Sequence, residues 1–121
     1  MRVVQLAEFR KESEILTVSY EPDTAIIGLG SGQTVRFDCV IGFRVLDERD
    51  LGEFWPACSL PHGGIFEILE GGWIDQESRR PAFISASERR ELREFFITGP
   101  HSCVNVIGRE DPKLEVRCIQ E

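Results

Sequence analysis

The segment from Val35 to Leu46 alternates between apolar and other side chains, and this pattern constrains the fold more than any other feature of the sequence. Successive side chains of a β-strand point to opposite faces, so period two over this length predicts one long, half-buried strand. We place Gly42 on the outer face, where a glycine marks a bulge or a close backbone approach. The face expected to be buried carries Val35, Phe37, Cys39, Ile41, Phe43 and Val45.

Shorter β-rich runs lie on both sides of this segment. They are residues 16–20, 25–29, 65–70, 95–98, 103–107 and 114–119. Residues 3–9 fit either a strand or a helix. Sequences rich in glycine, proline and aspartate separate many of these runs, and short turns of that kind join antiparallel neighbours.

One short helix is expected near residues 47–55. Asp47 fits an N-cap, and Leu51, Phe54 and Trp55 follow at helical spacing before a proline ends the segment. A helix of about two turns is stable only when its apolar face packs on other elements. We therefore expect these three side chains to cover part of the sheet.

These elements predict a mainly β fold, with an α+β fold as the alternative. We expect residues 1–121 to form a single domain of about seven or eight strands in an antiparallel meander. The meander forms a curled sheet, a sandwich or a half-barrel. Because no alternation of strands with long helices is present, a parallel doubly wound fold is not expected.

The charge balance excludes some partners. The chain has 14 basic and 21 acidic residues, a net charge of −7, whereas nucleic-acid binding relies on basic surface. No apolar stretch approaches the ~20 residues of a membrane helix, and the N-terminus does not resemble a signal peptide. We expect a cytoplasmic protein that binds neither nucleic acid nor membrane.

No catalytic motif is present, so we do not expect an enzyme. Gly28, Gly30 and Gly32 resemble a dinucleotide-binding fingerprint, but Gln33 occupies the position of its third glycine and a strand follows instead of a helix. They are better interpreted as turn glycines. We expect no cofactor.

Four residues of metal-binding type lie outside the apolar strand faces, namely Cys58, His62, His101 and Cys103. Two thiolates and two imidazoles can hold zinc in a tetrahedron. Their spacing matches no standard zinc finger or ribbon, so we expect no metal. His101 and Cys103 share a face only if both lie in one strand.

The segment 47–77 contains eight acidic residues against one arginine, a net charge equal to that of the whole chain, together with both tryptophans. Aromatic anchors among carboxylates are typical of a surface that binds a basic protein. We predict that this surface contains Trp73, Glu67, Glu70, Asp75 and Glu77. The alternative interpretation is that these acidic side chains only keep the surface soluble. The five arginines between 79 and 93 are then expected to pair with these acids within the fold.

The sequence thus favours a non-enzymatic interaction protein that engages a basic protein partner through an acidic and aromatic surface at 47–77. An inhibitor or immunity-type protein that neutralises a toxin has this size and acidity. One alternative is a small β-barrel that binds or transforms a small molecule, which requires a buried polar constellation in its interior. The other alternative is a structural homo-oligomer, such as a homodimer, whose edge strands pair across a two-fold axis.

Overall fold

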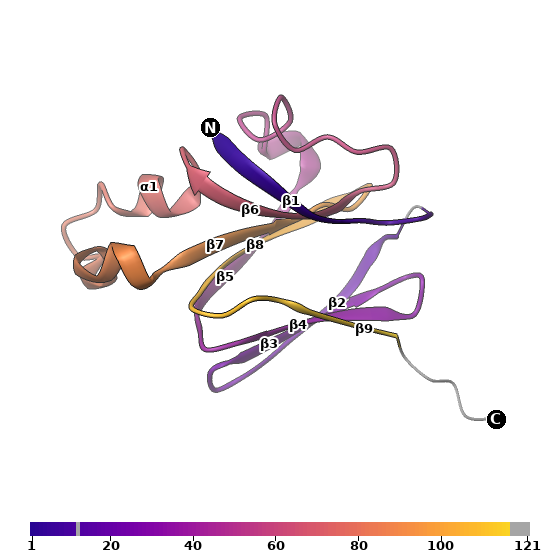
Figure 1. Cartoon of the computed structure of the whole chain (residues 1–121), viewed down its shortest axis with the longest axis horizontal. Helices are drawn as coiled ribbons and strands as arrows, with labels where there is room; N and C mark the ends of the chain where they lie inside the picture. Colours follow the sequence, from indigo (N-terminus) through magenta and orange to yellow (C-terminus); the bar gives the residue numbers. More distant parts are fainter. Residues whose placement is uncertain (12, 117–121) are drawn as a thin grey trace.

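Two antiparallel β-sheets pack face to face in a computed structural model that describes residues 1–11 and 13–116 (Figure 1). The five-stranded sheet has the order β1-β6-β7-β8-β5 and the four-stranded sheet the order β2-β3-β4-β9. The strands are β1 (Arg2–Glu8), β2 (Ile15–Glu21), β3 (Thr24–Leu29), β4 (Gln33–Asp38), β5 (Val40–Asp47), β6 (Gly64–Glu70), β7 (Arg93–Ile97), β8 (Ser102–Gly108) and β9 (Lys113–Val116). The expected mainly β antiparallel fold is confirmed, with nine strands among the described residues. Of the three expected forms, the curled sheet, the sandwich and the half-barrel, the structure is a sandwich whose sheets are not closed into a barrel.

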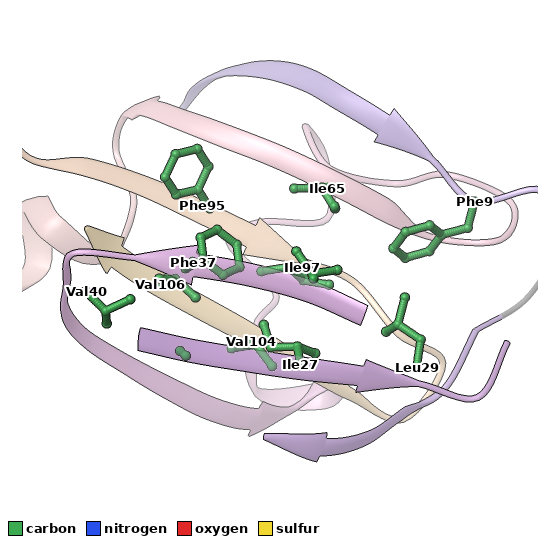
Figure 2. Close-up of a cluster of buried hydrophobic side chains, with 12 residues drawn as sticks. Phe9, Ile27, Leu29, Phe37, Val40, Ile65, Phe95, Ile97, Val104 and Val106 are labelled. Atoms are coloured by element: carbon green, nitrogen blue, oxygen red, sulfur yellow. The ribbon is translucent and has the colours of Figure 1, made fainter. Parts of the chain in front are cut away.

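The main core lies between the two sheets. Figure 2 shows side chains from strands of both sheets meeting there, with Phe37 of β4 and Phe95 of β7 at a ring-centroid distance of 5.3 Å. The cluster consists of Phe9, Ala25, Ile27, Leu29, Val35, Phe37, Val40, Ile65, Phe95, Ile97, Val104 and Val106. These side chains come from strands of alternating pattern, so each sheet buries one apolar face.

The expected long strand is wrong in one respect, because it breaks at Cys39. Cys39 adopts a φ of 55°, and the chain passes there from β4 in one sheet to β5 in the other. Phe37 is buried, but Cys39 is exposed and Ile41 is 39% exposed. The expected face does not continue through the break, because Val40, which lies outside that face, is buried in the core, and the pairing of β5 with β8 shifts between Val40 and Gly42. Beyond the shift Phe43 packs on the core again, but β5 lies at a sheet edge, where its side chains are only partly covered.

The segment expected to form a helix begins at its predicted cap. The Asp47 side chain accepts a hydrogen bond from the backbone N–H of Arg49, but the helix is the short 3-10 helix η1 (Glu48–Asp50), and turns follow it. Leu51 and Phe54 are fully buried, as the pattern predicted, and Phe54 stacks on Phe96 at 4.5 Å. They cover the outer face of the five-stranded sheet.

The α-helix of the structure lies elsewhere. Helix α1 (Trp73–Glu77) follows β6, and the 3-10 helix η2 (Ile84–Glu91) precedes β7. Ile74 of α1 packs with Leu92 and Ile107 in a small cluster on the same outer face. Of the expected closing strand 114–119, residues 117–119 lie outside the described residues. Among the described residues, no helix is long and apolar enough to cross a membrane.

Replacing Phe37 with alanine is expected to lower the free energy of unfolding by about 3–5 kcal/mol, because the ring is fully enclosed by both sheets. Phe43→Ala is the matched control, since Phe43 is only partly buried at the edge strand, and its loss should be clearly smaller. Denaturant titration of both variants measures the difference. Equal losses would contradict this assignment of the core.

Candidate functional site

The structure pairs each acidic residue of the predicted surface with an arginine. The pairs are Glu67–Arg93 at 2.9 Å, Glu70–Arg2 at 3.0 Å, Asp75–Arg89 at 3.8 Å and Glu77–Arg80 at 2.8 Å. Three of these arginines belong to the segment 79–93, in agreement with the alternative interpretation from the sequence. The Glu67–Arg93 pair is largely buried, whereas the exposed pairs contribute little stability. All four pairs reduce the charge available to a partner.

The predicted surface is also divided between two faces. Trp73, Asp75 and Glu77 lie together on α1. Glu67 lies on the opposite face of the five-stranded sheet, because it alternates along β6 with Phe66 and Ile68, which pack on the outer face. The structure therefore brings Trp73, Asp75 and Glu77 together and separates Glu67 from them.

Trp73 is held in a fixed position and remains half-exposed. Its indole N–H donates to Oε1 of Glu77 at 3.1 Å, and the guanidinium of Arg44 lies over the ring at 5.0 Å. Trp55, in contrast, donates its indole N–H to the carbonyl of Glu48 and packs against the cluster around Phe96. Of the two tryptophans, Trp73 is the one that lines a cleft beside α1.

The cleft beside Trp73 has a volume of about 360 Å³. Because Gly42 of β5 carries no side chain, the space above it stays open, and an added Cβ there would lie 3.9 Å from the Trp73 ring. Ile41, at the β5 edge, and Ile84, which is 82% exposed, add apolar surface nearby. The cleft is lined by Ile41, Gly42, Phe43, Trp73, Glu77, Arg80, Phe83 and Ile107.

A buried carboxylate anchors α1 beneath this cleft. Glu94 of β7 is 2% exposed, and its two oxygens accept hydrogen bonds from the backbone N–H groups of Trp73 and Ile74, each at 2.8 Å. Burial raises the pKa of Glu94 above its ordinary value, against the opposing effects of these two N–H groups and of Arg44. Gly72 is required next to it, because a Cβ at that position would collide with the Glu94 carboxylate.

Glu94 was missed in the sequence analysis. The available signal was that Glu94 directly precedes the apolar run Phe95–Ile97 within β7, a central strand. A charged side chain in such a position is buried only when it is hydrogen-bonded or paired.

Arg44 and Asn105 complete a polar group between the apolar clusters of the outer face. Nε of Arg44 donates to Oδ1 of Asn105 at 2.9 Å. Burial lowers the pKa of Arg44, while Glu94, Glu53 and Glu77 raise it. The Asn105 amide is fully buried, and its Nδ2 is the one buried side-chain nitrogen or oxygen without a partner among the described residues. The Arg44 guanidinium therefore packs against the Trp73 ring from the sheet side, and its charge is only partly exposed to solvent.

A second cleft, of about 560 Å³, lies between the segment 58–63 and the β7–β8 turn. Cys58 lines it, but burial raises the pKa of this thiol to about 12, and Cys103 reaches about 11 for the same reason. Both are protonated at neutral pH and pack in one apolar cluster, so neither is an activated nucleophile. His62 and His101 are exposed.

The described residues contain no group of three or more histidine, cysteine, aspartate or glutamate side chains that could hold a metal ion. Comparison with protein-family models, with curated proteins and with solved structures gives no significant match.

The absence of zinc remains a prediction. We expect purified protein to contain no stoichiometric zinc, because Cys58 and Cys103 sit as neutral thiols in an apolar cluster. Elemental analysis measures this directly. One zinc per chain that disappears in Cys58→Ala would contradict it.

The raised pKa of Glu94 predicts a pH dependence of stability. A carboxyl group whose pKa is raised by folding stabilises the fold fully below its unfolded value of 4.5, and that contribution is lost as the pH rises through the folded value. The free energy of unfolding of the wild type, relative to Glu94→Gln, should therefore fall as the pH rises above about 4.5. Denaturant titrations of both proteins across this range measure it, and a difference that stays constant or grows with pH would refute it.

Proposed function

We propose that this protein is a non-enzymatic interaction protein that binds a basic protein partner through the Trp73 cleft and the acidic residues beside it. The observation that carries the proposal is a half-exposed tryptophan, fixed by hydrogen bonds, at the rim of an aromatic cleft. Tryptophan is a frequent anchor of protein interfaces. The fixed ring also loses little conformational freedom on binding.

The acids that support a basic partner differ from those expected from the sequence. Glu48, Asp50 and Glu53 form no ion pair with any described basic side chain. The side-chain amide of Gln76 donates to Glu53 at 3.5 Å, so Glu53 adjoins α1, whereas Glu48 lines the second cleft. Unpaired carboxylates beside an apolar anchor steer a cationic partner and fix its orientation.

The small-molecule alternative has less support. The space between the sheets is filled by apolar side chains, and the sheets do not form a barrel with an interior cavity. The buried polar group around Glu94 lies on the outer face and anchors α1. A cytoplasmic location, with inhibition of a basic toxin as one role of this kind, stays part of the proposal.

Capture from a lysate of the source organism, followed by titration of the purified captured protein, tests the proposal. We expect the captured protein to be basic and Trp73→Ala to weaken its binding by about 30-fold or more, chiefly through faster dissociation. Reversing Asp50 and Glu53 to lysine should slow association about tenfold at low salt and flatten its salt dependence.

Glu8→Lys is the matched control, because Glu8 is an exposed acid on β1, at the opposite edge of the same sheet. It should bind like the wild type. If the wild type, Trp73→Ala and the charge-reversed variant recover the same proteins equally, the proposed function is wrong.

A further inference from the structure

The edge of β5 differs from the other sheet edges of the described chain. β1 has two register irregularities, β2 has one, and β9 has four residues, which include Lys113 and Glu115. Bulges, short length and charge are the devices that protect edge strands from pairing with other chains. β5 also has one register shift, between Val40 and Gly42, but it is the longest of the edge strands of the described chain. It pairs without a shift with β8 from Gly42 to Asp47, which leaves this part of its free edge open to another strand.

Apolar side chains stand uncovered along the core-facing side of this edge. Phe43 packs on the core and meets the ring of Tyr20 at 5.6 Å, and Val45 shares its face by alternation. Val45 is 44% exposed and Tyr20 of β2 55%. A strand placed beside β5 would cover this row if its own side chains on that face were apolar.

The outer side of the same edge presents the cleft and the acids. Gly42 leaves the space beside Trp73 open to a side chain from a neighbouring strand. Glu77 lines the cleft, and Glu53 adjoins α1. Glu77 is paired there with Arg80, which also lines the cleft, so Glu53 supplies the unpaired carboxylate beside it. The side chains of an added strand that alternate with its apolar ones would face this aromatic cleft. Long basic side chains suit it, because their aliphatic stems lie on aromatic rings and their charge is opposite to that of Glu53.

Resting on the proposed function, we infer that the partner contributes an extended segment of alternating apolar and basic residues, which adds to β5 as a further strand of the five-stranded sheet. Backbone hydrogen bonds to the β5 edge supply affinity, and the cleft above Gly42 selects side chains on the outer face.

Charge argues for this occupant over a second copy of the chain. An antiparallel pair of two β5 strands centred on Phe43 would set Asp47 of one copy opposite Cys39 of the other. Asp23, Asp38 and Glu110 lie near Cys39. Arg36 and Lys113 pair with Asp38, and Arg49 pairs with Asp47, so Asp23 and Glu110 are the acids that would remain in excess near the ends of such a pair. Two chains of net charge −7 also repel each other.

The test uses an eight-residue peptide of alternating valine and lysine with blocked ends, and a matched peptide N-methylated at alternate amides to remove its donors along one edge. We expect the first peptide to bind and the N-methylated peptide to bind about tenfold more weakly or worse. Hydrogen exchange read by mass spectrometry should show new protection in residues 40–47.

Gly42→Val should reduce binding at least about fivefold because it fills the cleft, whereas the matched Gly52→Val, in open space, should not.

Several results overturn strand addition. These are no binding of the valine–lysine peptide at millimolar concentration, equal binding of both peptides, unchanged exchange at 40–47 on binding, or a chain that sediments as a dimer with β5 already protected. If Gly42→Val does not fold, Gly42→Ala replaces it, since its Cβ meets only an ordinary contact. A captured basic protein that depends on Trp73 but leaves β5 exchange unchanged refutes strand addition alone and leaves the proposed function standing.

Discussion

The contact between the Glu94 carboxylate and the first backbone N–H groups of α1 determines the arrangement of the surface beside Trp73. A buried carboxylate is tolerated only when its oxygens are hydrogen-bonded, and here two backbone donors meet that requirement. The same two bonds fix the start of α1 and hence the position of Trp73. Gly72 permits the close approach, and Arg44, held by Asn105, supports the ring from the sheet side. The cleft is therefore built on a rigid central strand, although its lining includes a short helix.

Electrostatics within the chain explains why acidity alone is a poor guide to the binding surface. The chain has twelve arginines and two lysines, and arginine suits fixed pairing with carboxylates. Arg93 binds both oxygens of Glu67, and Arg80 pairs with Glu77. The segment that looks uniformly acidic in the sequence thus separates into acids paired by the fold and a small unpaired set at 48–53. Only that unpaired set can steer a partner without first breaking internal pairs.

The proposed binding mode follows from the way the sandwich ends at β5. The chain passes from one sheet to the other at Cys39, and β5 then lies at an edge of the five-stranded sheet. On the apolar side of β5, Phe43 contacts Tyr20 of β2. Exposed, regular edges are uncommon in proteins because they pair with other chains. Here the edge coincides with the cleft beside Trp73, so backbone pairing and side-chain recognition can act on one extended segment.

The sequence by itself determined most strand positions, the mainly β antiparallel fold and most of the apolar faces, because side-chain alternation and turn residues are local properties of the chain. It did not decide between a curled sheet, a sandwich and a half-barrel. It also identified Asp47 as a cap and Leu51 and Phe54 as buried. It could not reveal the break at Cys39, since the apolar alternation in the sequence runs on through residues 35–46, although the buried face shifts at Val40. The role of Glu94, the pairing of acids with distant arginines and the open space above Gly42 were decided only by tertiary structure, because each depends on residues far apart in the sequence meeting across sheet and helix.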